Sequence, residues 1–178
     1  MKKPLFNIVM RYIILLAIAL IVSFSSLFYD IFLLLTIYPL NWLLNLSYMS
    51  FVYNSSILVE SANISIIPAC VGVSAYLLLL ILNLSVAMSL KKRVFSILFS
   101  FSCLLLANIL RIYLLILLLL NGSSYFDALH MLLWYFTSIV LVVGIWFLTA
   151  YIFKIRAIPI YTDFQFILKG MKTKHTKK

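Results

Sequence analysis

Four long apolar runs dominate the amino-acid sequence. They contain 17 to 27 residues each, with at most one charge. This is the length that crosses about 30 Å of hydrocarbon as a helix rising about 1.5 Å per residue. A soluble domain carries about 25% charged residues to cover its surface, whereas this chain carries 10%, with 66% hydrophobic residues. These features exclude a water-soluble or disordered chain and predict a single all-α polytopic membrane domain over residues 1–178. Its four expected transmembrane helices are Tyr12–Phe28, Val71–Leu90, Val94–Leu120 and Met131–Phe153.

Basic residues are clustered between these runs. Lys91–Arg93 separate two expected helices and are predicted to form a tight loop, and residues 154–178 form a Lys-rich tail. The positive-inside rule places both on the cytoplasmic side, together with Lys2, Lys3 and Arg11. Membrane topology therefore explains the formal charge of +10, and we expect no nucleic-acid partner.

The segment 31–53 decides the side on which the N-terminus lies. If the N-terminus is cytoplasmic, this segment cannot cross the membrane fully, and Pro39 is expected to break any helix there. Asn41, Asn45 and Tyr48 then form one polar stripe, which predicts a tilted, re-entrant or interfacial helix in the outer leaflet. The alternative is a fifth transmembrane helix with the N-terminus outside.

Two further segments complete the expected layout. The first apolar run follows a basic N-terminus, as in a signal peptide, but it continues through Phe28, which favours an uncleaved signal anchor. Residues 54–69 are an expected outer loop. Within it, Ser56–Val59 and Ile64–Ile67 flank a polar turn and predict a short β-hairpin.

Three chemically capable side chains are expected at one depth, just below the outer surface. An ionisable group inside a bilayer costs several kcal/mol unless it is paired or faces a polar cavity, and Arg111 is the only basic residue well inside an expected span. Counted from the cytoplasmic ends of their helices, Arg111 lies about 27 Å up, Cys70 about 31 Å and His130 about 36 Å. Cys103 comes out near the middle of the bilayer, where we expect it to pack among leucines.

These residue types can perform acyl transfer through a thioester. The Cys70 thiol becomes nucleophilic as a thiolate, which a neighbouring cation, a histidine base or the start of a helix favours. His130 can take the thiol proton and return it to a leaving amine, and Arg111 can stabilise the thiolate, a substrate carboxylate or an oxyanion. Gly72 would let a substrate backbone approach closely. Packing or an interfacial position explains each residue alone, but their common depth favours a site.

Three further polar residues are expected beside this set. Asn108 and Ser74 share a helix face with the arginine and the cysteine, three and four residues away respectively. Asp127, one turn before the histidine, could orient the imidazole or serve as an ordinary acid near a helix N-terminus.

Other chemistries lack their sequence signatures. The two cysteines are far apart without a Cys-x-x-Cys motif, and no His-Glu-x-x-His pair or second intramembrane histidine is present. We therefore expect no metal and no cofactor. Gly-x-Ser-x-Gly and paired intramembrane aspartates, which mark other intramembrane proteases, are also missing.

The order and spacing of the motifs resemble the exosortase/archaeosortase family, most closely its short archaeal members. The resemblance rests on Ala69–Gly72 at the outer start of a span, Asn108–Ile112 near the outer end of the next, and His130 opening the one after. It covers about residues 64–146. The sequence departs from the family at Val71, where Ser or Thr is common, and at Trp134, where a glycine often stands.

The resemblance implies a cysteine transpeptidase embedded in the plasma membrane with its active site at the outer face. Such enzymes recognise secreted proteins ending in a short motif, a transmembrane helix and a basic cluster, and pass the cleaved C-terminus to a lipid or other anchor. Cys70 would be the nucleophile, Arg111 the motif arginine and His130 the third catalytic position. The alternative from another class is a non-enzymatic membrane protein, a subunit of an anion or small-molecule carrier or an assembly scaffold.

Overall fold

Helices make up most of the chain, and the only sheet in the described part is small. The computed structural model describes residues 2–60, 62–86, 88–134 and 138–155. The three strands are β1 Ser50–Tyr53, β2 Ser56–Val59 and β3 Ala62–Ser65. The helices are α1 Lys2–Phe24, α2 Ser26–Leu44, α3 Pro68–Val71, α4 Val73–Ser85, α5 Leu90–Leu120, α6 Phe126–Leu132 and α7 Ser138–Ile152.

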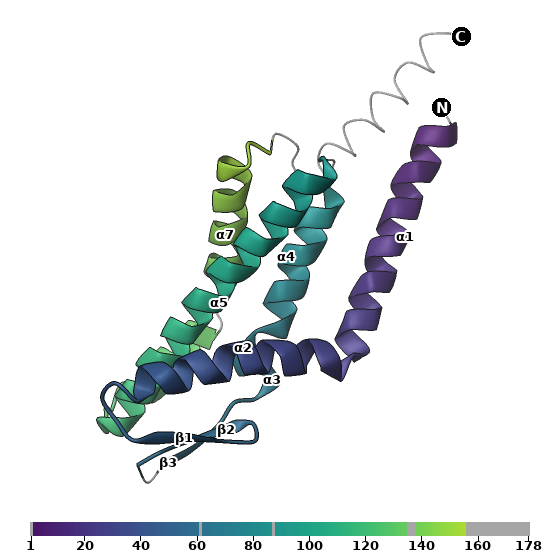
Figure 1. Ribbon diagram of the computed structural model, residues 1–178. Helices are drawn as coiled ribbons and strands as arrows, with labels where there is room; N and C mark the ends of the chain where they lie inside the picture. Colours follow the sequence, from purple (N-terminus) through teal and green to yellow (C-terminus); the bar gives the residue numbers. More distant parts are fainter. Residues whose placement is uncertain (1, 61, 87, 135–137, 156–178) are drawn as a thin grey trace.

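The longer helices form a bundle with a distinct end. Helices α1, α4, α5 and α7 run broadly along one direction, and the chain's N-terminus lies at the same end as the start of α5 (Figure 1). At the opposite end, α2 runs across the bundle and the sheet lies beyond it (Figure 1). The cysteine-bearing helix α3 lies at this second end.

Two helices have both the length and the composition of a membrane span. They are Ser26–Leu44 and Leu90–Leu120, and shorter apolar helical stretches occur at Met10–Val22, Val73–Ser85 and Ile139–Ile152. Within the described residues, length and composition therefore identify two candidate spans where the sequence predicted four. This finding supports a membrane location without fixing the topology.

Several predicted helix boundaries are wrong. The first helix ends at Phe24 rather than Phe28, and α2 begins at Ser26 after a break at Ser25. The span predicted over residues 71–90 is interrupted at Gly72 and ends at Ser85. For the span predicted over residues 131–153, the structure describes α6 up to Leu132 and α7 from Ser138.

The basic triplet predicted as a loop belongs to a helix. Lys91–Arg93 lie in the first turn of α5, and the Arg93 N–H donates to the Ser89 carbonyl oxygen at 3.0 Å. Lys and Arg have high helix propensity, so a break in hydropathy need not be a break in the backbone. Helix α4 ends at Ser85 and α5 begins at Leu90, so the chain has already entered α5 at the triplet. Of the tail predicted over residues 154–178, only Lys154 and Ile155 lie within the described part.

Pro39 does not break α2, contrary to the prediction. It lies inside the helix and is exposed. A proline removes one backbone donor, but the remaining turns of α2 are held by packing. One face of the helix is buried, through Phe32, Leu33, Thr36, Ile37, Leu40 and Leu44.

The sheet contains the predicted hairpin and one additional strand. Strands β1, β2 and β3 pair antiparallel in chain order, with Tyr53 opposite Ser56 and Ser56 opposite Ser65. Strand β3 ends at Ser65, two residues earlier than predicted. The polar residues of α2 anchor β1, since the Asn45 side chain accepts from the Ser50 N–H at 3.0 Å and donates to its carbonyl oxygen at 3.2 Å.

Helices α4 and α5 are joined by an aromatic contact and a polar contact. The ring of Tyr76 lies 5.2 Å from that of Phe101 and 4.0 Å from that of Phe32. Near the other end of α4, the buried Asn83 donates to the Ser100 hydroxyl at 3.2 Å and accepts from that of Ser96. These contacts hold α5 in register with α4, and so fix the height of Arg111 relative to Cys70.

Candidate functional site

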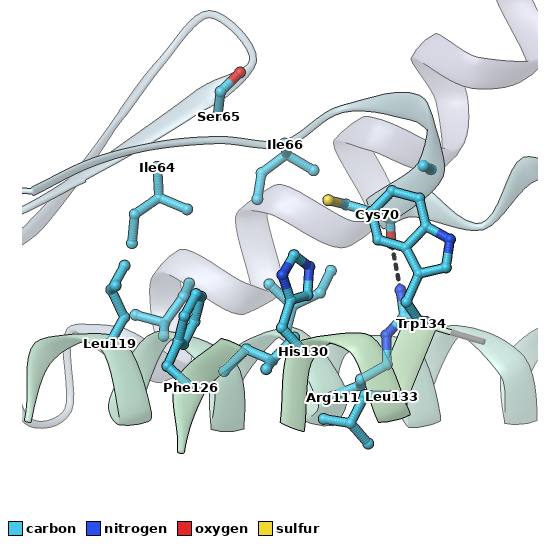
Figure 2. A pocket seen from close by; sticks show the side chains of 14 residues that line it. Ile64, Ser65, Ile66, Cys70, Arg111, Leu119, Phe126, His130, Leu133 and Trp134 are labelled. Atoms are coloured by element: carbon cyan, nitrogen blue, oxygen red, sulfur yellow. Dashed lines mark hydrogen bonds between the residues drawn. The ribbon is translucent and has the colours of Figure 1, made fainter. Parts of the chain in front are cut away.

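One cavity brings together the three residues singled out from the sequence. Cys70 from α3, Arg111 from α5 and His130 from α6 all line it (Figure 2). Its volume is about 160 Å³. The rest of the lining is almost entirely apolar and includes Ile64, Ile66, Ile112, Leu115, Ile116, Leu119 and Leu133.

Cys70 lies in a short helix that proline starts and glycine ends. Pro68 occupies the first turn of α3, and the Cys70 N–H donates to the Ile67 carbonyl oxygen at 2.8 Å. Gly72 ends the helix with a φ of 77°, in the left-handed region. The side chain of Cys70 is half-buried, and its sulfur points into the cavity on the side where the His130 ring lies (Figure 2).

Two side chains of α5 hold the carbonyl oxygen of Cys70. The Asn108 amide donates to it at 2.8 Å and to the Val71 carbonyl oxygen at 3.1 Å. The Arg111 Nη2 donates to the same Cys70 oxygen at 3.2 Å (Figure 2). Helix α3 ends after four residues, so its last carbonyl oxygens have no backbone N–H partner in a following helical turn. The side chains of Asn108 and Arg111 in α5 donate to these oxygens instead. The predicted neighbour Asn108 is 4% exposed and supports the backbone at Cys70.

His130 lies between two aromatic rings of its own segment. Its ring centroid is 5.5 Å from that of Phe126 and 5.7 Å from that of Trp134. Both rings also line the cavity. Asp127, which was expected to orient the imidazole, is exposed and is not among the described residues that line the cavity.

A second cavity lies against the same arginine. It has a volume of about 300 Å³, and its polar lining comes from Ser74, Asn108 and Arg111. Arg111 and Trp134 line both cavities. Ser74 therefore shares the second cavity with the arginine but does not reach the first.

Gly72 has a backbone role in addition to the expected one. A Cβ atom at this position would meet no protein atom within 4 Å, so packing within the chain does not require glycine here. The positive φ of Gly72 does require it, because only glycine adopts this conformation without strain, and the approach of a substrate backbone stays a prediction. Gly72 therefore sets the angle at which α4 leaves the cysteine-bearing helix.

Sequence reasoning missed the aromatic residues of the site. Phe126, His130 and Trp134 recur at intervals of four residues, which places them on one helix face. That spacing was readable from the sequence. The contribution of β3 was not, because the position of the sheet over the cavity depends on tertiary packing.

The described residues contain no group of three or more His, Cys, Asp or Glu side chains arranged to hold a metal ion. Cys103 lines neither cavity and packs against the hydrophobic core, as expected. The site therefore offers a thiol, an imidazole and a guanidinium in an apolar cavity.

Comparison with known proteins gives no match. No protein-family model, no curated protein and no solved structure is significantly similar to the chain.

Proposed function

We propose that the chain is a membrane-embedded cysteine transpeptidase of the exosortase/archaeosortase type. The observation that carries the proposal is the meeting of Cys70, Arg111 and His130, from three separate helices, in one cavity. In this proposal α1, α4, α5 and α7 cross the plasma membrane, while α2 and the sheet lie at the outer face.

The distribution of charge supports this orientation. The described basic residues other than Arg111 belong to the end at which α5 starts, and Lys92 contacts the backbone of Lys154 there. The positive-inside rule makes that end cytoplasmic. Helix α4 has 13 residues and a length of about 20 Å, roughly two-thirds of the hydrocarbon thickness, and α3 precedes it after the bend at Gly72. The cavity with Cys70 then opens near the outer surface.

The first chemical step is attack of the Cys70 sulfur on a substrate carbonyl carbon. His130 takes the thiol proton, a C–S bond forms, and the carbonyl oxygen becomes an oxyanion. Arg111 supplies a fixed positive charge beside the sulfur-bearing residue, which stabilises both the thiolate and the oxyanion. The C–N bond then breaks, and the amine leaves with the proton held by His130.

The second step releases the product. An acceptor hydroxyl or amine, or water, attacks the thioester carbonyl carbon while His130 takes the acceptor's proton. The C–S bond breaks, and the proton returns to the sulfur of Cys70. Transfer to a lipid or other anchor and hydrolysis differ only in the identity of this acceptor.

The position of the cavity fits the substrate that the resemblance implies. A secreted protein with a C-terminal transmembrane helix and a basic cluster keeps the cluster on the cytoplasmic side. Residues just before its helix then lie at the outer surface, the level proposed for Cys70. The apolar lining suits a segment with aliphatic side chains.

A processing assay tests the proposal. Cells co-express the chain with a reporter that ends in a motif, a transmembrane helix and a basic cluster, and loss of the reporter's C-terminal segment is followed by immunoblot. We expect processing by the wild type and by Cys103→Ala, the matched cysteine control, and none by Cys70→Ala. Processing that persists in Cys70→Ala at equal expression would refute the proposal.

The same variants distinguish an anion carrier or scaffold from an enzyme. In a carrier, Arg111→Lys would change anion binding while Cys70→Ala would have no effect. In the transpeptidase, Cys70→Ala and Arg111→Lys both reduce processing, and a hydroxylamine-sensitive adduct forms only when Cys70 is present.

A further inference from the structure

A second group of basic residues converges at the opposite end of the bundle. Arg11 of α1 and Arg93 of α5 line one cavity of about 350 Å³. The cavity lies between α1 and the end of α4, on the side of the bundle far from Cys70. Neither the sequence motifs nor the proposed catalysis accounts for it.

The remaining walls of this cavity are apolar. Helix α1 contributes Ile14 and Ile18, at a spacing that places both on one face, and α4 contributes Leu84. Two guanidinium groups thus lie at the rim of a hydrophobic surface. Such a surface suits a ligand with an anionic head and an aliphatic chain.

The arginine of α5 is held in place but retains donor capacity. Its Nη2 donates to the Val86 carbonyl oxygen at 3.0 Å. Its Nε is buried and, among the described residues, makes no hydrogen bond. Guanidinium nitrogens in this state favour an oxyanion, and above all a phosphate, which can accept two parallel hydrogen bonds.

The described carboxylates lie elsewhere. Asp30 is in α2, Glu60 follows β2 and Asp127 is in α6, all at the end with the sheet. None of these three described carboxylates lines the cavity with the two arginines. The bilayer surface around the cavity supplies anionic lipid heads.

We propose that Arg11 and Arg93 bind the phosphate of an anionic phospholipid, with an acyl or isoprenoid chain lying along α1. Basic pockets between transmembrane helices on the cytoplasmic side bind anionic lipid heads in this way. The lipid fills the space between α1 and the α4–α5 pair and fastens α1 to the bundle. This role is independent of the proposed catalysis.

Lipid retention measured by native mass spectrometry tests the site. The full chain is purified from mixed phosphatidylglycerol and phosphatidylcholine micelles, and the bound lipids are counted. We expect selective retention of phosphatidylglycerol, reduced on the order of tenfold in Arg11→Gln/Arg93→Gln. The control Lys91→Gln/Lys154→Gln removes the same charge from exposed positions outside the cavity and should keep the selectivity.

Two further measurements use the wild-type chain and so do not depend on how the variants fold. A photoreactive phosphatidylglycerol should label peptides containing Ile14, Ile18 or Leu84. Inorganic phosphate or glycerol 3-phosphate at millimolar concentration should leave the thermal unfolding temperature unchanged, whereas phosphatidylglycerol should raise it. Equal losses in both double variants, labelling spread over α2 and α7, or an equal effect of free phosphate would overturn the proposal.

Discussion

Asn108 shows how a single side chain can support the proposed nucleophile, Cys70, through its backbone alone. Its amide holds the carbonyl oxygens of Cys70 and Val71. Asn108→Ala leaves two carbonyls without this partner, so we expect a stability loss of about 1–3 kcal/mol. Because the backbone of Cys70 then shifts, reporter processing should fall by about tenfold or more.

Asn83 is the matched control for this effect. It is equally buried and its amide bonds to Leu79 and Ser100, but it lines neither cavity of the site. Asn83→Ala should lower the unfolding temperature while processing per folded molecule stays near the wild-type rate. If both variants lose processing in proportion to stability alone, Asn108 has no positioning role.

Single residues of the site were largely predictable, but their contacts were not. Counting the helical rise placed Cys70, Arg111 and His130 at one depth. The count works because the position of a residue in a membrane-spanning helix determines its depth. The binding of Asn108 and Arg111 to a carbonyl oxygen of Cys70 was not readable, since a backbone acceptor leaves no trace in the residue type. The aromatic partners of His130 were readable from their spacing but were not recognised.

The joint between α3 and α4 depends on one backbone conformation. At Gly72, φ is 77° and a Cβ atom would meet no neighbour within 4 Å. Gly72→Ala should therefore destabilise the protein by about 1–2 kcal/mol through strain alone, and Gly72→Asn by less, because asparagine tolerates the left-handed region. Thermal unfolding of the purified variants measures this.

Gly144 provides the comparison. It lies within α7, it also has open space around its Cβ position, and its φ is not positive. Gly144→Ala should be neutral or stabilising by up to about 1 kcal/mol. A similar loss in both variants would mean that conformational strain is not the reason for glycine at position 72.

At the level of elements, hydropathy predicted where apolar helices lie, but neither the number of candidate spans nor the helix ends. The prediction failed at Pro39, because the packing of one face of α2 outweighs one missing donor. It failed at Lys91–Arg93, because charged residues with high helix propensity can begin a helix. Strand β1 was missed because it falls in a segment predicted to be helical. Its anchors, Asn41 and Asn45, were interpreted as part of the polar stripe of that helix.

In the proposed orientation the N-terminus and the end of α7 both lie on the cytoplasmic side, since Lys154, just after α7, contacts Lys92 near the start of α5. The chain begins at the end of the bundle where α5 starts, and α2 lies across the other end (Figure 1). A fluorescent protein that folds only in the cytoplasm should therefore be bright when fused to the N-terminus or to the C-terminus. The five-span alternative instead predicts a dark N-terminal fusion. Fusion in the turn at Asn54 and Ser55, between β1 and β2, is the negative control for both alternatives.

The support of Cys70 by its carbonyl oxygen has a consequence for finding the physiological partner. Every amino acid has that oxygen, so Asn108 and Arg111 can hold residue 70 equally well when it is alanine. A chain that keeps its pocket but has lost its sulfur can still engage a partner without cutting it. Cys70→Ala is then a trap, and the protein that accumulates on it in cells would reveal the sequence that the cavity recognises.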